Sequence, residues 1–299
     1  MRLLPLNSAY FISDLTLTIL QFLLQRKLRL IQDVFNRFFP DCKDNFDAKK
    51  LSFETLRLSI KNQIDVMRYP LISPKNIDQY VDYEGLDNLD LVIKSKKGVI
   101  LMFGHFGANQ FIIPALGHKG YPINQISTFP GAWEEISGQI TGKLKQLAYK
   151  CQRNCESHLP VNFLDIRKSI RPALRCLEQG EILLVAFDGR GGSKWEKVDY
   201  LNHKANLTTI PCQIAVKTGA SILPVYIMRK KNKHILKIEK PIYSGGDEKP
   251  EDIIREFVKW FEPIVKMHPE HYLWLLQAAM IRGKLDEVPL FDLKNFRFY

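Results

Sequence analysis

The feature that most constrains the fold is a short, continuous apolar run, GVILMFG, at residues 98–104. A run of this length without alternating polar residues is typical of a strand that is covered on both faces. Further strand candidates follow at 121–127 and 181–187, and again in SILPVYIMR, and helical segments such as IRPALRCLEQGE and EDIIREFVKWFEPIVKMHP lie between or after them. This alternation predicts an α/β sheet with helices on both faces. Such sheets bind ligands at the carboxyl ends of their strands.

The first 90 residues differ from the rest of the chain and are predicted to be helical. Apolar residues recur at three- and four-residue spacing in IQDVFNRFF and LSFETLRLSIKNQIDVMRY. We therefore expect an N-terminal helical, membrane-associated extension at residues 1–90. An α/β domain follows at 91–299, and the two parts are expected to form one continuous unit.

A membrane role is expected because of the segment LTLTILQFLLQRKLR. Polar residues at helical spacing form a stripe that begins just before this segment; they are Asp14, Thr18, Gln21 and Gln25. Leucines and an isoleucine cover the remaining surface, and the segment ends in a basic cluster of Arg26, Lys27 and Arg29. This pattern is typical of a helix that lies in the membrane interface with its basic end near lipid headgroups. An amphipathic helix packed on the domain core has the same periodicity, so both interpretations stay open.

The charge of the chain points to an anionic partner. The formal net charge is +11 and the pI is about 9.3. Nucleic acid, an anionic membrane surface and an acidic protein each fit such a charge. The sequence contains no recognisable nucleic-acid-binding module and no basic stripe interleaved with stacking aromatics, so we do not expect a nucleic-acid partner. The basic segment with Arg229, Lys230, Lys231 and Lys233 is expected to be a solvated turn that also suits contact with an acidic carrier protein or anionic lipid.

The cysteines give no sign of a disulfide framework or a metal site. They number five, are scattered, and include no CxxC pair. This usage is typical of reduced thiols on the cytosolic side of a membrane.

Polar residues appear directly after the apolar run, where the strand is expected to end. His105 lies between Gly104 and Gly107, and Asn109 and Gln110 follow. The glycines allow close backbone approach, so a substrate can reach the imidazole, whose ordinary pKa of about 6.5 suits a general base. The residues after Gly107 are expected to open a helix. Its first amide groups would face an oxyanion, with Asn109 as its cap or as a donor to substrate.

A second polar position follows the strand predicted at 181–187. Asp188 stands there, before Gly189, Arg190, Gly191 and Gly192. An aspartate before a glycine-rich loop is often only a turn residue. Arg190 is suited to bind a phosphate group of a substrate.

The order and spacing of several motifs resemble a known family. The spacing from His105 to Gln110 resembles the His-x4-acid motif of the lysophospholipid acyltransferase superfamily. The chain is most similar to the bacterial lipid A biosynthesis (late lauroyl/myristoyl) acyltransferases, from about Arg26 to about Leu276. The local matches are RLIQDVFNRFFPD, VDYEGLDNLD, GHFGANQ, RKSIRPALRCLEQGE, VAFDGRGG, IAVKTGASILPVY and HPEHYLWL.

The resemblance implies a glycerol-3-phosphate acyltransferase-like α/β fold, with a mixed sheet flanked by helices and membrane-associated N-terminal helices. It implies an enzyme on the cytoplasmic face of the inner membrane, peripheral or shallowly anchored. Such an enzyme moves a fatty acyl chain from an acyl carrier protein or coenzyme A thioester to a hydroxyl of a membrane glycolipid, such as a lipid A precursor. It needs no metal and no cofactor other than the acyl thioester co-substrate.

This chain departs from the family pattern at the position of the acid, which is Gln110. A glutamine can orient the imidazole but supplies no charge, and an acid-to-amide change in a serine-protease triad costs about 10⁴ in turnover. Three interpretations stay open: a working His–Gln variant, an enzyme that takes its acid from elsewhere, and an inactive relative. Asp188 falls where the family carries a further functional acid. The family often has a second acid two residues later, where this chain has Arg190.

The residues predicted to act follow from these observations. We predict His105, Gln110 and Asp188 as catalytic residues, with His105 as the base that activates the acceptor hydroxyl. The residues predicted to bind substrate are Gly104, Gly107, Asn109, Arg190 and Gly191. Two other functions stay open: a lipid-binding relative without activity, and an acyltransferase for a lysophospholipid or another glycolipid.

SKWEKV is predicted to be an exposed loop. The aromatic residues near the end of the sequence are expected in the core or at the lipid boundary; they are Trp260, Phe261, Tyr272 and Trp274.

Overall fold

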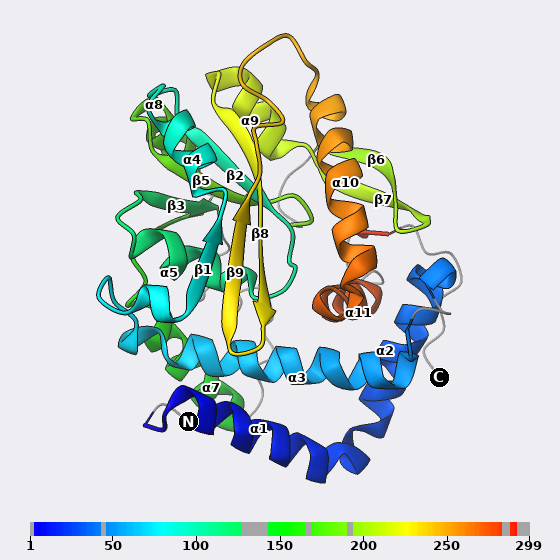
Figure 1. Cartoon of the computed structure of the whole chain (residues 1–299). Coiled ribbons are helices and arrows are strands. Elements are labelled where there is room, and N and C mark those ends of the chain that lie inside the picture. The colour runs from blue at the N-terminus through cyan, green and yellow to red at the C-terminus, as the bar shows by residue number, and fades with distance from the viewer. Residues whose placement is uncertain are drawn as a thin grey trace.

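The computed structural model describes residues 3–42, 46–126, 143–165, 169–189, 194–282 and 288–291. Its centre is a mixed seven-stranded sheet with the strand order β1-β9-β8-β2-β5-β3-β4 (Figure 1). The strands are β1 Val81–Glu84, β2 Val99–Phe103, β3 Ile123–Ile126, β4 Asn162–Leu164, β5 Ile182–Ala186, β8 Ser221–Lys230 and β9 Lys233–Ile238. Strands β8 and β9 form an antiparallel pair, and the other neighbours in this sheet are parallel. The prediction of an α/β fold with a mixed sheet is confirmed.

Strand β2 lies in the middle of this sheet and is buried on both faces, as its apolar run predicted. No residue of β2 is more than 2% exposed. Its successive side chains point to opposite faces, because the side-chain period of a strand is two residues. Leu101 packs in one hydrophobic cluster, with residues of α4 (Leu86–Ile93) and α5 (Ile112–Gly117). Met102 packs in the other, with residues of α8 (Arg171–Glu178), α9 (Ile210–Thr218) and α10 (Pro250–Met267).

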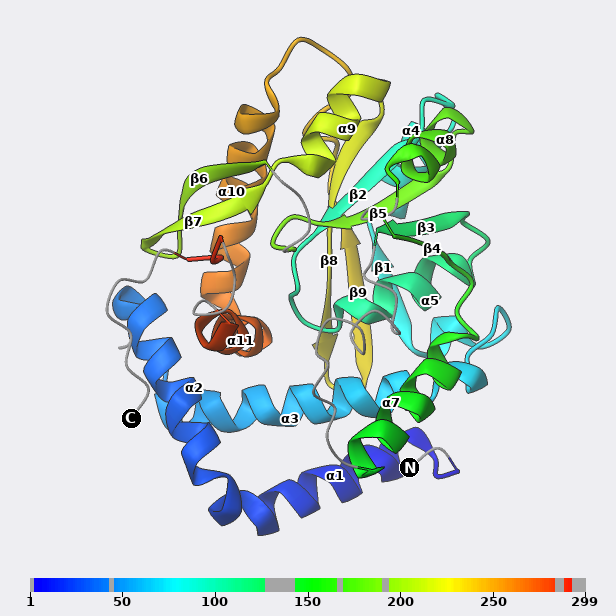
Figure 2. The same ribbon diagram turned by 180° about the vertical axis from the view of Figure 1, so that it is seen from behind.

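The N-terminal helices pack against one end of the sheet. Helix α3 (Ala48–Met67) crosses below the strands, and α1 (Leu6–Leu20) runs beneath α3 (Figure 1). Helix α2 (Gln25–Phe38) packs against both α3 and α11 (Leu273–Arg282), and its buried residues belong to the same hydrophobic cluster as α10. Seen from behind, α7 (Lys143–Glu156) lies beside α3 and near the N-terminus (Figure 2). The short 3-10 helices are η1 Gln21–Leu24, η2 Pro40–Cys42, η3 Tyr69–Leu71, η4 Ile77–Gln79, η5 Asn109–Phe111 and η6 Pro269–His271.

Two local predictions differ from the structure. The expected helical character of residues 1–90 does not extend to β1, which pairs with β9 as an edge strand of the main sheet. The prediction of an exposed loop at SKWEKV is wrong, because β6 (Trp195–Tyr200) pairs with β7 (His203–Thr208) in a two-stranded sheet. Strand β1 alternates apolar and polar residues over only four positions, and β6 does so incompletely over six. Patterns this short do not distinguish a strand from a loop.

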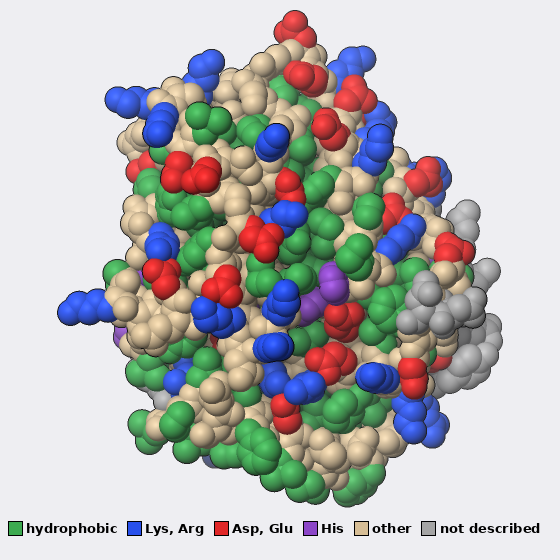
Figure 3. Space-filling model, viewed as in Figure 1, with side chains coloured by type: hydrophobic (Ala, Val, Ile, Leu, Met, Phe, Trp, Pro, Cys, Tyr) green, Lys and Arg blue, Asp and Glu red, His purple; other side chains and the backbone are tan. Residues whose placement is uncertain are grey.

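Helix α1 presents its apolar side outward. Asp14, from the predicted polar stripe, forms ion pairs of 2.9 Å with Arg57 and Lys61 of α3. Leu15 is 50% exposed and Ile19 is 59% exposed. Hydrophobic side chains accordingly gather along the lower edge of the molecule, where α1 runs (Figure 3). Of the helices that the structure describes, none is long and apolar enough to cross a membrane.

Candidate functional site

The ends of β2 and β5 bring together a histidine and an aspartate. The two strands are parallel, with Phe103 beside Ala186, so the residues two positions beyond each of them meet. The Nδ1 atom of His105 lies 2.6 Å from Oδ1 of Asp188, and the backbone N–H of His105 donates to Oδ2 over 2.9 Å. The aspartate side chain is fully buried, whereas the imidazole is 41% exposed. The carboxylate therefore holds the histidine from inside, and the ring is accessible from outside.

This arrangement has the chemistry of a general base. A carboxylate that accepts the Nδ1 proton selects the tautomer in which Nε2 carries the lone pair. The same carboxylate stabilises the imidazolium that forms when Nε2 takes up a proton. Of the three interpretations of Gln110, this position of Asp188 fits the one in which the acid that partners His105 comes from elsewhere in the chain.

Tyr272 completes the surroundings of the aspartate. Its hydroxyl donates to Oδ2 of Asp188 over 2.8 Å, and its side chain is completely buried. Burial, and then the charge of Asp188, raise the pKa of Tyr272 well above its ordinary value. Tyr272 was expected in the core or at the lipid boundary, and its contact with Asp188 was not predicted. Tyr272 belongs to the motif HPEHYLWL, which carries part of the resemblance to the acyltransferases but does not connect residue 272 with residue 188.

The turn between β2 and η5 is fixed by three other elements. The Gly107 N–H donates to the His271 carbonyl over 2.9 Å, and the Ala108 N–H donates to the Ile227 carbonyl over 3.2 Å. The Gly107 carbonyl accepts a 2.9 Å hydrogen bond from Nδ2 of Asn62. Gly107 has a φ of +63°, and a Cβ there would lie 2.1 Å from the Ile227 oxygen, so only glycine fits.

These contacts correct the expectation for the oxyanion donors. The amides of Gly107 and Ala108 already donate to protein carbonyls and are not available to a substrate. Within the described part of the chain, the amides of Asn109 and Gln110 have no acceptor. If amides of this turn bind an oxyanion, these are the two that remain.

The two polar side chains of η5 do not behave as expected. Asn109 is half-buried and does not cap the helix, because Ala108 is at the N-cap position and no side chain caps the amides; that expectation is wrong. Gln110 is exposed, and no hydrogen bond between described residues joins it to His105. Gly104 lies between the rings of Phe261 and Phe187, where a Cβ would come within 2.8 Å of both. Arg190 and Gly191 lie outside the described residues.

The basic segment near residue 230 is not a simple solvated turn. Arg229 is only 8% exposed and forms an ion pair with Asp65, while its Nη1 donates to the Tyr10 hydroxyl over 2.9 Å. His234 lies 3.1 Å from the same carboxylate. Burial raises the pKa of Asp65, but Arg229 and the hydrogen bonds from His234 and Tyr10 bring it below its ordinary value. The expectation of a solvated residue is therefore wrong for Arg229.

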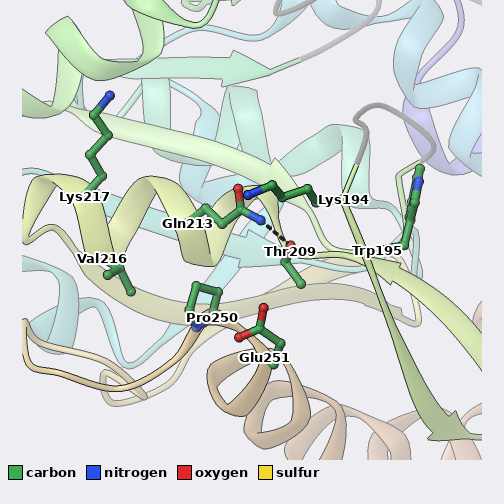
Figure 4. Close-up of a pocket in the computed structure, with 8 residues that line it drawn as sticks. All are labelled: Lys194, Trp195, Thr209, Gln213, Val216, Lys217, Pro250 and Glu251. Carbon is green, nitrogen blue, oxygen red and sulfur yellow. Dashed lines mark hydrogen bonds between the residues drawn. The ribbon is translucent and has the colours of Figure 1, made fainter.

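A separate cleft of about 660 Å³ lies between α9, the first residues of α10 and the start of β6 (Figure 4). Gln213 donates to the Thr209 hydroxyl over 2.6 Å within it. Its lining is Lys194, Trp195, Thr209, Gln213, Val216, Lys217, Pro250 and Glu251, so it contains no histidine comparable to His105. Among the described residues, no group of His, Cys, Asp and Glu side chains could hold a metal ion.

One comparison with known proteins gave a match. Residues 139–278 match the model of a protein family described as "Bacterial lipid A biosynthesis acyltransferase". The matched range contains Asp188 and Tyr272 and begins after His105. No curated protein matches the chain.

Proposed function

The match over residues 139–278 supports membership of the bacterial lipid A biosynthesis acyltransferase family, and from this premise we propose that the protein acylates a membrane glycolipid. The donor is an acyl thioester of an acyl carrier protein or of coenzyme A. The acceptor is a hydroxyl group, such as one of a lipid A precursor. The observation that carries the proposal is the contact between His105 and the buried Asp188.

The proposed reaction proceeds by direct attack. Nε2 of His105 takes the proton of the acceptor hydroxyl as its oxygen attacks the thioester carbonyl. The tetrahedral intermediate collapses, the carbon–sulfur bond breaks, and the imidazolium returns the proton to the leaving thiolate. Asp188 stabilises the imidazolium between these two proton transfers. Gln110 has no part in orienting His105 in this scheme.

The exposed apolar side of α1 and η1 supports a peripheral location at an anionic membrane surface. Phe22 is 64% exposed and Leu23 is 66% exposed, and the exposed basic residues Arg26, Lys27 and Arg29 follow directly. Burying one large apolar side chain contributes roughly 1.5–3 kcal/mol, and each basic residue near an anionic surface adds about 1 kcal/mol. Several such residues are enough for reversible binding. We propose the cytoplasmic face of the inner membrane as the site of action.

The proposal is tested by lipid mass spectrometry of cells with and without the gene, followed by transfer assays with the purified protein. We expect one lipid to lose an acyl chain in cells without the gene, and His105→Ala to abolish transfer in vitro. His158→Ala is the matched control, because His158 is exposed and its Nδ1 contacts the Asn154 carbonyl of its own helix end. Full transfer by the His105→Ala protein would refute the mechanism.

Gln110 motivates a second candidate, a membrane-lipid-binding relative that has lost the chemistry. The two functions are separated by assaying the native protein beside Gln110→Glu. Activity in the native protein supports the enzyme. Activity only after the acid is introduced supports the lost enzyme. Presenting lysophospholipid and glycolipid acceptors to the active form identifies the acceptor class.

A further inference from the structure

The segment 269–272, formed by η6 and Tyr272, contacts both halves of the candidate site. The His271 carbonyl accepts the N–H of Gly107, in the turn that carries His105. One residue later, the Tyr272 hydroxyl donates to Asp188. A single short segment therefore forms hydrogen bonds both to the turn after β2 and to the aspartate after β5.

Asp188 is a buried carboxylate whose donors can be named. Within the described residues, two of them belong to His105, its ring Nδ1 and its backbone N–H. Tyr272 supplies the third and is the donor that is independent of His105. A buried carboxylate depends on such donors, because burial removes it from bulk water and each donor stabilises the charged form.

We propose that Tyr272 is a positioning residue for the reaction, which acts by holding the Asp188 carboxylate in place and by moderating the basicity of the His105–Asp188 pair. This inference rests on the proposed function, in which that pair is the general base. Oδ2 of Asp188 is shared between Tyr272 and the His105 backbone, and Oδ1 then faces the imidazole. Without the phenol, the carboxylate keeps only the donors of the group that it has to orient.

The effect on basicity has a definite sign. A donor to the carboxylate stabilises its charge and so weakens proton uptake by the pair. Removing the donor raises the pH at which the pair loses its proton, whichever of the two groups carries it. The titratable neighbours of the phenol are Asp188 and Tyr200 of β6, and Glu262 of α10 acts on Tyr200. The adjacent His271 stays neutral, since burial lowers its pKa to about 3.

The test compares Tyr272→Phe with Tyr200→Phe. Both tyrosines are at most 1% exposed, and their rings meet edge to face at 6.1 Å, but no described hydrogen bond joins Tyr200 to Asp188. We expect Tyr272→Phe to lower kcat about tenfold with little change in KM, as for the loss of one hydrogen bond to a charged group. The acid limb of the kcat/KM profile should move to higher pH. Tyr200→Phe should leave both quantities within about twofold.

A double-mutant cycle tests whether Tyr272 acts through Asp188. In the Asp188→Asn background, Tyr272→Phe should cause little further loss of kcat. Equal losses in both backgrounds, or a loss without a shift of the pH profile, would show that the phenyl ring only contributes packing and would overturn the inference. Thermal unfolding of each variant checks that the comparison is made between folded proteins.

A measurement without substrate separates this inference from the proposed function. The ring of His105 is titrated by NMR in the full chain and assigned with His105→Gln. We expect its transition to move to higher pH in Tyr272→Phe and to stay in Tyr200→Phe. If the native protein transfers no acyl group, the proposed function fails, and this titration still decides the role of Tyr272. An unchanged transition would contradict it.

Discussion

At the scale of single residues, the important position is Gln110, where the acyltransferases that the chain resembles have an acid. In the structure, the buried Asp188 contacts the imidazole of His105, whereas Gln110 is exposed. We therefore predict that Asp188→Asn lowers kcat by about 10²–10⁴, because an amide can donate to Nδ1 and select the wrong tautomer. Gln110→Ala should retain kcat within a few-fold. Steady-state kinetics of both variants measure this, and a larger loss in Gln110→Ala would reverse the assignment.

The sequence predicted the two halves of this site but not their contact. His105 and Asp188 were identified because each follows an apolar run at a predicted strand end. Whether they touch depends on the register of β2 against β5, which pairs Phe103 with Ala186 across 83 residues of sequence. Spacing alone suggested Gln110 as the partner. The 3-10 turn at η5 turns that side chain toward solvent instead.

At the scale of elements, α3 holds the turn that carries His105. Nδ2 of Asn62 donates to the Gly107 carbonyl over 2.9 Å. An aspartate at this position has no donor and would repel the carbonyl, so we predict that Asn62→Asp lowers kcat about tenfold. Asn88→Asp is the matched control, since Nδ2 of Asn88 makes a 2.9 Å bond to the Ile238 carbonyl, away from the turn.

The comparison of these two variants combines kinetics with thermal unfolding. Both changes should lower the unfolding temperature by a few degrees, because each removes a side-chain bond to a carbonyl. Only Asn62→Asp should lower kcat. A similar loss of kcat in Asn88→Asp would mean that general destabilisation, and not the turn, explains the effect.

The elements that sequence patterns identified are those with long or fully apolar signals. Strands β2, β5 and β8 and helices α8 and α10 lie where they were predicted. Strands β1, β6 and β7 were missed, because each is short and its few apolar residues are interspersed with polar or charged ones. These strands gain their stability from cross-strand pairing and from burial of one face, which local sequence does not encode.

At the scale of the whole molecule, buried neutral histidines make the fold sensitive to acid. Burial lowers the pKa of His271 to about 3 and also lowers the pKa of His234. Below pH about 6.5 the unfolded chain binds protons at these residues and the folded chain does not. Stability is therefore lost as the pH falls, by up to about 1.36 kcal/mol per pH unit for each histidine.

Urea unfolding at pH 7.0, 5.5 and 4.5 measures this dependence. We expect the free energy of unfolding to fall steadily over the series, and His271→Gln to reduce the slope between pH 6 and 4.5. His158→Gln, at an exposed histidine, should leave the slope unchanged. A slope that is the same in all three proteins would exclude His271 as a source of the acid sensitivity.

The outward apolar side of α1 and η1 leads to a prediction about membranes. We expect Phe22→Ser combined with Leu23→Ser to weaken binding to phosphatidylglycerol-containing vesicles by at least about tenfold, because each change removes roughly 1.5–3 kcal/mol of burial. Leu91→Ser is the control, as Leu91 of α4 is 70% exposed on another part of the surface. Binding is measured by co-sedimentation with vesicles, and equal binding of all variants would argue against η1 as the membrane contact.

The central position of β2 has a consequence for synthesis of the chain. Its two neighbours in the sheet, β5 and β8, begin at Ile182 and Ser221, so the apolar residues 99–103 leave the ribosome long before either partner exists. Until residue 230 has emerged, such a nascent chain exposes an apolar strand that can pair with other chains. The candidate site needs Tyr272 as well, so it can assemble only after residue 272 has left the ribosome.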